Sequence, residues 1–388
     1  MKIANIVGAR PQFIKYFPIS QAINRFNETC GNVFDDILIH TGQHYDYNMS
    51  KVFFDEFGMK MPEYHLEVGS GSHGEQTGQI LQKVEDVLIK ESPDIVLVYG
   101  DTNSTLGAAL AAVKLHIPVA HIEAGLRSFN KYMPEEINRI LTSNVSTLLF
   151  CPSKTAVTNL IYDGYKNILN EGELVEIDFL LQNKIKLNIK ADKNEPLVIN
   201  VGDVMYDVLL YALKIAEERS DAIDKLQLFG KQYYLLTLHR AEITDDTEKL
   251  HEIIDFVNDV SVNKRVVFPM HPRMKNVYKI AKNKLNQNVE IIKPMSYLDM
   301  LMLMKNSDLI MTDSGGMQKE AYWLKIPCIT LRDETEWIET VQSGWNVLYK
   351  NYCGLRRPVK NDGAYYGDGK SSERIVSVLA EKLIEDKL

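Results

Sequence analysis

Residues 94–125, DIVLVYGDTNSTLGAALAAVKLHIPVAHIEAG, decide the fold class of this chain. Two apolar, β-branched runs, 94–101 and 118–125, are typical of strands, and a helical pattern over 104–116 separates them. A strand, a helix and a second strand in this order form a βαβ unit, in which the two strands are parallel. Continuous apolar runs are typical of parallel strands covered on both faces. The stretch therefore predicts an α/β fold with a doubly wound parallel sheet.

The same alternation extends through the chain in two series, one before about residue 200 and one after. Further strands are expected at 2–7, 35–42 and 147–153 in the first series, and at 197–202, 233–239, 265–271, 289–294, 309–315 and 326–333 in the second. Helical patterns are found at 12–27, 73–91, 203–228, 246–260, 297–306 and 315–324.

Two series predict two Rossmann-like domains, since one hydrophobic core rarely serves 388 residues. We expect an N-terminal domain over 1–202, a C-terminal domain over 203–370 and a helix over 371–388 that packs back on the N-terminal domain. The stretch 168–196 is rich in Asn, Lys, Glu and Leu and has no clear strand signal before Leu197. It is interpreted as a connector or insertion near the domain boundary.

Composition narrows the range of functions. The net charge of −8 argues against a nucleic-acid partner, which would favour a basic stripe, and gives no reason to expect an anionic membrane surface. The N-terminus lacks the apolar core of a signal peptide, and no apolar run approaches the length that spans a bilayer. The four cysteines are scattered with no zinc or disulfide spacing, and Cys151 and Cys328 are expected as buried free thiols. These features predict a cytoplasmic protein.

Charged residues and histidines gather just after the predicted strands, where parallel α/β sheets bind ligands. The candidates are Arg10, Lys15, Asp101, Glu123 and Glu135 in the first half, and His239, Arg240, His271, Arg273, Ser314, Gly315, Gly316 and Glu320 in the second. Any one of them is readily explained as a polar residue at a solvent-exposed strand end. The whole set is better explained by loops at one edge of both sheets that converge on a single cleft.

The stretch TDSGGMQKEA, 312–321, leads from a strand through two glycines into a helix. The absent Cβ atoms let a phosphate approach the backbone, and a helix N-terminus presents free N–H groups. Ser314 adds a hydroxyl, and Glu320 is placed to accept hydrogen bonds from a ribose. Arg10, Lys15, His239 and Arg240 are candidates to neutralise a diphosphate. The competing interpretation is a tight glycine turn with no ligand.

Two common nucleotide sites are disfavoured. The first predicted strand is followed by GARPQF rather than the G-x-G-x-x-G of dinucleotide-binding proteins, and the P-loop pattern is absent. A nucleophilic serine is disfavoured too, because the G-x-S-x-G elbow is missing. NAD and a P-loop nucleotide are therefore disfavoured as ligands.

Asp101, Glu123 and Glu135 are candidates for proton transfer, because carboxyls in different environments can act as acid and base. Each also has a structural explanation: an N-cap for Asp101, an ion pair with Arg127 for Glu123, and a favourable first-turn position for Glu135. No H-x-x-x-H or D-x-D pairing accompanies them, and no metal site is predicted.

The ordered motifs resemble those of the non-hydrolysing UDP-N-acetylglucosamine 2-epimerases over almost the whole chain. The motifs are GARPQFIK (8–15), TGQHYDYNM (41–49), GDTNST (100–105), HIEAGLRS (121–128), MPEEINR (133–139), LTLHRAE (236–242), HPR (271–273), TDSGGMQKEA (312–321) and RDETEWIE (332–339). The resemblance implies a glycosyltransferase-B-like fold with two Rossmann-like domains facing across a cleft, no cofactor, a homodimer and a UDP-sugar substrate.

The resemblance also implies a reaction and the roles of individual residues in it. UDP leaves by anti elimination as the C2 proton is lost, giving a 2-acetamidoglucal, and UDP then adds back after protonation of the other face. Asp101, Glu123 and Glu135 match the catalytic acids of the family, and His239 matches its essential histidine. The residues that match its UDP contacts are Arg10, Ser314, Gly315, Gly316 and Glu320, with Lys15 as an active-site lysine and Pro294 and Met295 in the segment whose backbone contacts uracil.

Several departures bear on the substrate. Trp337 stands where many bacterial members have a second arginine, and Tyr45 and Asp46 replace residues of the allosteric members. Together with GSGSHGEQTG (69–78), RDETEW favours a branch that epimerises UDP-2,3-diacetamido-2,3-dideoxyglucuronate, which is the second candidate substrate. Three different functions stay open beside epimerisation at this point: a hydrolysing epimerase, a glycosyltransferase of the same fold and a nucleotide-sugar sensor.

Overall fold

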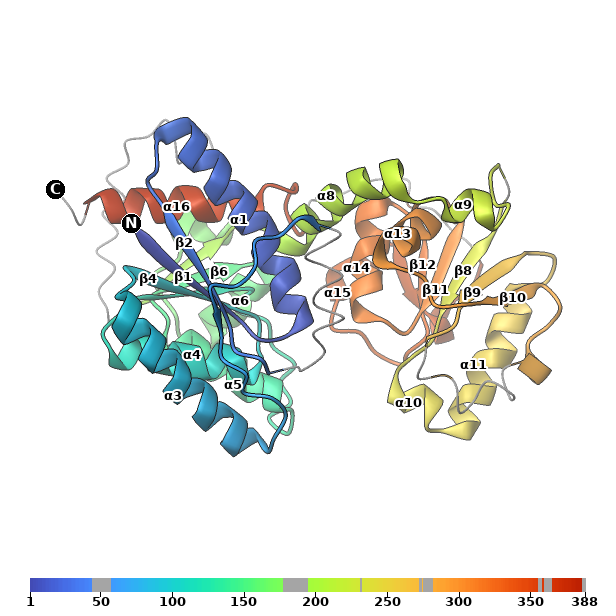
Figure 1. The fold of residues 1–388 in the computed structure, drawn as a ribbon. Helices are drawn as coiled ribbons and strands as arrows, with labels where there is room; N and C mark the ends of the chain where they lie inside the picture. The colour runs from blue at the N-terminus through green and yellow to red at the C-terminus, as the bar shows by residue number, and fades with distance from the viewer. Residues whose placement is uncertain are drawn as a thin grey trace. The chain divides into compact units, whose positions relative to one another are not determined.

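The computed structural model of the chain describes residues 1–43, 57–176, 195–230, 232–271, 274, 282–354, 358 and 365–385. It divides into two compact units, Met1–Val208 with Ala364–Leu388 and Leu209–Gly363, coloured along the chain in Figure 1. The sequence predicts breaks after residues 202 and 370 instead. Helix α8, Val204–Arg219, begins in the first unit and continues in the second, and no composition change marks the boundary inside it.

The first unit has a parallel sheet of seven strands in the order β3-β2-β1-β4-β5-β6-β7. Its strands are β1 Lys2–Val7, β2 Asp35–His40, β3 Tyr64–His65, β4 Ile95–Tyr99, β5 Val119–Ile122, β6 Leu148–Cys151 and β7 Leu197–Asn200. Helices α3 His73–Glu91, α4 Asn103–Lys114 and α5 Pro134–Val145 cover one face of the sheet (Figure 1). On the other face α1, Arg10–Cys30, packs against α16, Ser371–Glu385. Helix α6, Lys154–Tyr162, joins β6 to η1, Leu169–Gly172.

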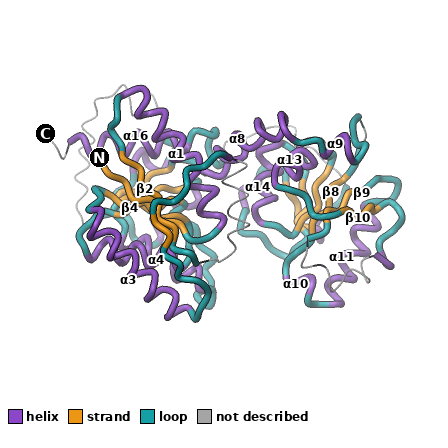
Figure 2. The backbone as a smooth tube through the Cα atoms, viewed as in Figure 1, coloured by secondary structure: helices purple, strands orange, loops and turns teal. Residues whose placement is uncertain are grey.

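The second unit repeats the design with six parallel strands in the order β10-β9-β8-β11-β12-β13. These are β8 Tyr234–Thr237, β9 Val266–Pro269, β10 Val289–Ile292, β11 Leu309–Thr312, β12 Cys328–Thr330 and β13 Asn346–Leu348. The helices are α9 Ala222–Lys225, α10 Ala241–Thr244, α11 Thr247–Val260, α13 Tyr297–Lys305, α14 Gly315–Leu324 and α15 Ile338–Gln342, with the turn η3 at Tyr349–Asn351. Figure 2 shows strands at the centre of each unit and helices around them.

Two predictions about elements need correction. Strand β7 belongs to the first sheet, where it pairs with β6, so the second series starts at β8 and not at 197–202. The stretch 168–196 lies inside the first unit, before its last strand, within the range expected for the N-terminal domain; its residues 177–194 lie outside the described residues. The predicted helix 203–228 is two helices, α8 and α9, interrupted at Ser220, whose hydroxyl donates to Asp299.

The strands are short, and the central ones are almost completely buried because helices cover both faces of each sheet, whereas the edge strands β3 and β10 are partly exposed. Val96, Leu97 and Val98 of β4 have no exposed surface. The free thiols of Cys151 and Cys328 are buried as predicted. Burial of such runs supplies most of the stabilisation, at about 25 cal/mol per Å² of apolar surface.

The strand order places a switch point in each sheet. In the first sheet, the strands after β1 are added on one side of it, and β4 and the strands after it are added on the other side. In the second sheet, β8 corresponds to β1 and β11 corresponds to β4. Open parallel sheets bind ligands at the carboxyl ends of the strands that flank such a point. The loops after β1 and β4, and those after β8 and β11, are therefore where a site is expected in each unit.

We predict that Gly125→Ala destabilises the first unit by about 2–3 kcal/mol. Gly125 has φ +83°, and a Cβ atom there would lie 2.4 Å from the backbone oxygen of Ala156. The measurement is the shift of the apparent melting temperature. Gly78→Ala is the matched control, because Gly78 lies within α3 with nothing within 4 Å of the added atom. That change should stabilise the protein by about 1 kcal/mol, and equal effects of the two substitutions would contradict the prediction.

Candidate functional site

In the first unit, Lys15 and Glu123 form a buried ion pair. Glu123 follows β5 with φ +70°, a left-handed conformation that a non-glycine residue rarely adopts and that is often found at functional sites. Burial lowers the pKa of Lys15, but the attraction of Glu123 and its hydrogen bond outweigh that effect and leave the pKa above its ordinary value. A Cβ atom at Gly100 would lie 3.3 Å from Glu123 Oε2 and 3.5 Å from Lys15 Nζ. The pair therefore lies against the loop that carries Asp101.

Two side chains of helix α5 bond to Asp101. Its carboxylate accepts from Arg139, and its backbone oxygen accepts from Asn138 Nδ2 at 2.9 Å. Arg139 also donates to the buried carboxylate of Glu136 at 2.6 Å. One third of the Asp101 side chain, 32%, stays exposed, so the acid is oriented by a cation and still accessible to a ligand.

The structure does not support two of the non-catalytic explanations, the N-cap role of Asp101 and the ion pair of Glu123 with Arg127. Thr102, not Asp101, is the N-cap of α4, where its side chain accepts from Thr105 N. Arg127 pairs with Asp163 at 2.8 Å rather than with Glu123. Glu135 is exposed and lies in the first turn of α5, where an acid stabilises the helix N-terminus. Both explanations of Glu135, helix stabilisation and proton transfer, therefore stay open.

Two buried polar residues fasten these loops together, and neither was among the predicted site residues. Gln12 Oε1 accepts from the backbone N–H groups of Gly8 and Ala9 at 2.7 and 3.0 Å, and Nε2 donates to Tyr99 O at 2.7 Å. His121 Nε2 lies 2.7 Å from Gly100 O, and burial lowers the pKa of His121 to about 4, so the neutral ring donates this bond. Both residues belong to the motifs that carry the resemblance, which is the signal that could have found them.

Arg10 and Lys15 belong to the first turns of α1, at the end of β1. Arg10 is exposed and is the first residue of the helix, and Pro11 is the second. The sequence allows Lys15 to be either a ligand contact or a solvated side chain, and the structure buries it with Glu123. Lys15, Asp101 and Glu123 are thus brought to one edge of the first sheet.

In the second unit, Asp313 orients the residues that follow β8. It is fully buried, and its Oδ2 accepts from the backbone N–H groups of His239 and Arg240 at 2.7 and 2.8 Å. Its Oδ1 lies 3.0 Å from His239 Nδ1. Burial raises the pKa of Asp313, but the hydrogen bond and charge of His239 and the two backbone bonds leave it below its ordinary value. Asp313 was not predicted as a site residue.

The turn at Ser314, Gly315 and Gly316 opens helix α14 as predicted. Ser314 is the N-cap, and its side chain accepts from Met317 N. A Cβ atom at Gly316 would meet nothing within 4 Å, whereas one at Gly315 would lie 2.6 Å from Glu336 Oε1. The open approach to this helix N-terminus is therefore on the Gly316 side, which suits an anion.

Glu320 lies in the second turn of α14 and is partly buried. Tyr297, at the start of α13, donates its hydroxyl to Glu320 Oε1 at 2.9 Å. Burial raises the pKa of Glu320 to about 7, although the Tyr297 bond and the charge of Lys319 lower it. Pro294 and Met295 form the loop between β10 and α13, with Pro294 exposed and Met295 half-buried.

His271 follows β9, and its ring centroid lies 5.4 Å from that of His239. Arg273 lies outside the described residues, as do His44, Tyr45 and Asp46. Among the described residues, no group of three or more His, Cys, Asp or Glu side chains could hold a metal ion. In the same part of the chain, no helix is long and apolar enough to cross a membrane.

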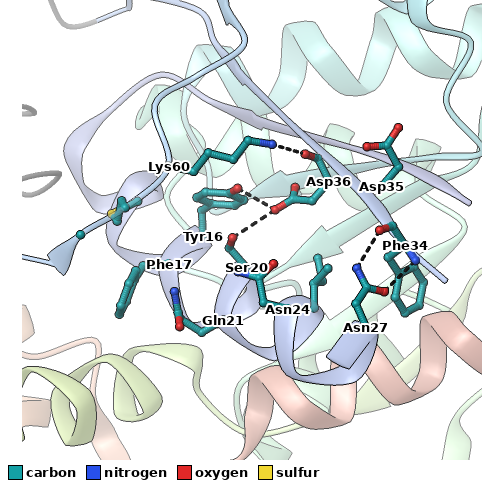
Figure 3. A pocket seen from close by; sticks show the side chains of 13 residues that line it. Tyr16, Phe17, Ser20, Gln21, Asn24, Asn27, Phe34, Asp35, Asp36 and Lys60 are labelled. Carbon is teal, nitrogen blue, oxygen red and sulfur yellow. Dashed lines mark hydrogen bonds between the residues drawn. The ribbon is translucent and has the colours of Figure 1, made fainter. Parts of the chain in front are cut away.

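A polar pocket of about 320 Å³ lies between α1, the start of β2 and residues 58–60 (Figure 3). Its centre is Asp36, whose carboxylate accepts from Tyr16 Oη at 2.7 Å and Ser20 Oγ at 3.1 Å. Asn5 donates to the same carboxylate at 2.7 Å. These side chains satisfy one another and fasten α1 to the sheet, at the edge opposite to the candidate site.

Two Rossmann-like units, each with charged side chains at the carboxyl edge of its parallel sheet, define the class of protein as glycosyltransferase-B-like α/β. The family follows from comparison. The chain belongs to the UDP-N-acetylglucosamine 2-epimerase family, whose model matches residues 29–380. The resemblance predicted from the motifs is thereby confirmed.

Individual relatives match along their whole length. A UDP-N-acetylglucosamine 2-epimerase homolog of Methanococcus maripaludis is 47% identical over 98% of this chain and 99% of the relative. The UDP-2,3-diacetamido-2,3-dideoxy-D-glucuronate 2-epimerase of Pseudomonas aeruginosa is 44% identical over 98% of this chain and all of its own length, 100%. The crystal structure of Methanocaldococcus jannaschii UDP-GlcNAc 2-epimerase with UDP-GlcNAc and UDP has a TM-score of 0.75 at 42% identity, covering 98% and 99% of the two chains.

Proposed function

We propose that this enzyme inverts C2 of a UDP-HexNAc, converting UDP-N-acetylglucosamine to UDP-N-acetylmannosamine by elimination and re-addition of UDP. A base removes the C2 proton while the C1–O bond to UDP breaks, and the electron pair forms a C1–C2 double bond. The glycal is then protonated at C2 from the other face, and UDP adds back at C1. Departure of the diphosphate is what makes the C2 proton removable, since no carbonyl adjoins that carbon.

The observation that carries the proposal is the placement of Asp101 and Glu123. Strands β4 and β5 pair with Tyr99 opposite Ile122, so the residues that follow them leave the sheet side by side. Glu123 is backed by Lys15 and Asp101 by Arg139, which gives two carboxylates in different surroundings at one edge. Inversion needs proton transfer on both faces of the ring, and two such carboxylates supply it. Glu135 is the third candidate acid.

The second unit supplies the proposed anion site. The N–H groups at Gly315 and Gly316, the Ser314 hydroxyl and Arg240 are proposed to bind the diphosphate, together with Arg10 and His271. His239, oriented by Asp313, is proposed to stabilise the leaving phosphate. Glu320 is proposed to accept the ribose hydroxyls, and the backbone of Pro294 and Met295 to contact uracil. No cofactor is required by this scheme.

Turnover followed by NMR tests the function and its sugar. We expect conversion of UDP-N-acetylglucosamine alone to an equilibrium mixture of epimers, without an acceptor and without stoichiometric free UDP. The diacetamido glucuronate substrate is the second candidate, because the Pseudomonas aeruginosa relative is named for it and is 44% identical. Irreversible release of UDP and free N-acetylmannosamine would instead indicate a hydrolysing enzyme. A requirement for an acceptor would indicate a glycosyltransferase, and binding without turnover a sensor.

We predict that uridine binds more tightly at pH 8 than at pH 6. The raised pKa of Glu320, about 7, means that its carboxylate is mostly neutral at pH 6 and mostly ionised at pH 8. The ionised form is the better acceptor for ribose hydroxyls. Uridine carries no phosphate that would titrate, so the change in its affinity reports on the protein. In Glu320→Gln the affinity should be weaker and independent of pH over this interval, and an unchanged pH dependence would contradict the prediction.

A homodimer in the cytoplasm remains our prediction for the state and location of the enzyme. Sedimentation of the purified chain tests the first, and fractionation of cells tests the second.

A further inference from the structure

Asp203, in the loop between β7 and α8, is an acidic residue of the first unit that is only 1% exposed. Its Oδ1 accepts from Met205 N at 2.8 Å, as the N-cap residue of a helix does, and its own N–H donates to Tyr366 O at 2.8 Å. An N-cap does not require an acid, because asparagine and serine cap a helix about equally well. The burial of a carboxylate at this position therefore needs a second explanation.

A cavity of about 10 Å³ joins Asp203 to the ion pair of Lys15 and Glu123, since all three residues line it. The other residues that line it, among them Ile122 and Phe150, are apolar or glycine. A space of this size holds about one water molecule and is too small for a substrate. Asp203 thus lies behind the candidate catalytic pair, in apolar surroundings where charges act strongly on one another.

Proton transfer from the sugar changes the charge balance around Lys15. While Glu123 is ionised it neutralises the Lys15 ammonium, which is 8% exposed. Once Glu123 has taken the C2 proton this counter-charge is lost, and a buried cation that loses its partner is costly. Burial lowers the pKa of Lys15, whereas the charges of Glu123, Asp101 and Asp203, in that order, raise it. Asp203 therefore acts on the ammonium from the side away from Asp101 and is present in both protonation states of Glu123.

We propose that Asp203 is a positioning residue that acts through Lys15: it is the second counter-ion of the ammonium and holds it charged and in place while Glu123 gains and loses a proton. The inference rests on the proposed function and adds a residue that lies outside the motifs of the resemblance. Two carboxylates that share one ammonium each bind a proton more readily than a carboxylate with an ammonium of its own. Asp203 thereby makes Glu123 a stronger base than Lys15 alone would allow.

Other charged or titratable side chains also face this cluster. They are Asp101 after β4, His121 of β5, Arg127 after β5 and Asp207 of α8. Burial raises the pKa of Asp207 to about 6, so its ionisation has to be distinguished from that of Glu123 in any pH profile.

The pH dependence of kcat, measured by NMR turnover in both directions, tests the proposal. Asp203→Asn keeps the cap of α8 and removes only the charge. The limb of the profile that reports Glu123 should move to lower pH by about one unit, whether Glu123 acts as base or as acid, because its carboxylate then has the ammonium to itself. In the direction in which Glu123 is the base, kcat should fall about three- to tenfold. Asp203→Ser also keeps the cap and should show the same shift.

Asp246→Asn is the matched control, because Asp246 is an exposed aspartate that caps α11 in the second unit. Its profile should equal that of the wild type. Asp207→Asn should leave the Glu123 limb in place, and a limb that moves with it would belong to Asp207 and overturn the inference.

Melting temperatures show which variants fold, and either Asp203 variant alone decides. A profile with both limbs unmoved, even with a lower melting temperature or a lower kcat, would make Asp203 a structural residue and leave the epimerase function intact. Failure of the wild type to epimerise either candidate substrate would overturn both the function and the inference.

Discussion

Glu123→Gln should lower kcat for epimerisation by about 10²–10⁴-fold while UDP affinity changes only a few-fold. The side chain keeps its size, but it can no longer take or deliver a proton at C2. The same result is expected for Asp101→Asn, whose carboxylate lies at the end of the neighbouring strand. Both are measured by NMR turnover and by calorimetry with UDP.

Glu91→Gln is the matched control for these variants. Glu91 also pairs with a lysine, Lys2, at 3.1 Å, but at the start of β1, the opposite edge of the same sheet. Its turnover should equal that of the wild type. If Glu123→Gln and Asp101→Asn lost UDP binding, or kept wild-type turnover, both residues would be structural rather than catalytic.

Asp313→Ala should destabilise the second unit by about 3 kcal/mol and lower kcat by about 10²-fold. Removal of the carboxylate leaves the backbone N–H groups of His239 and Arg240 without their acceptor, in a place that is fully buried. It also removes the partner of the His239 ring. Because the pKa of Asp313 is lowered in the folded unit, the stability it contributes is present above its ordinary pKa and lost as the pH falls below it.

Denaturant unfolding of wild type, Asp313→Ala and Asp313→Asn measures this effect, with turnover assayed in parallel. Asp313→Asn retains one acceptor oxygen for the backbone bonds and should lose less stability than Asp313→Ala. Its kcat should still fall, since an amide pairs less well with His239. Equal stability of the three proteins would show that Asp313 does not fasten the loop after β8.

The regular parts of the fold were predictable because periodicity and glycine signals are local. Helix α14 begins at Gly315 and ends at Leu324, the range that the helical pattern predicts. Strand β7 shows the limit of such signals: a buried apolar run identifies a strand but not the sheet that it joins. Boundaries such as that inside α8 depend on tertiary packing, which no local pattern encodes.

The candidate site, like the fold, was predictable only in part. Motifs predicted which residues gather at the strand ends, but not which partners hold them. The ion pair of Lys15 with Glu123 joins residues far apart in sequence, and the positive φ of Glu123 is set by the turn that follows β5. The cavity that joins Asp203 to this pair is likewise formed by tertiary contacts and was not predicted. Asp313 stood inside a recognised motif, yet only its burial explains its role.

The central claim is that the enzyme inverts C2 by detaching UDP, so that C2 exchanges its proton with the solvent during turnover. Incubation of the enzyme with UDP-N-acetylglucosamine in D2O, followed by NMR, tests it most directly, with the diacetamido glucuronate substrate run beside it. We expect the epimerised product to carry deuterium at C2, with a trace of free UDP during turnover. A product that forms with its original hydrogen retained at C2 would contradict the account.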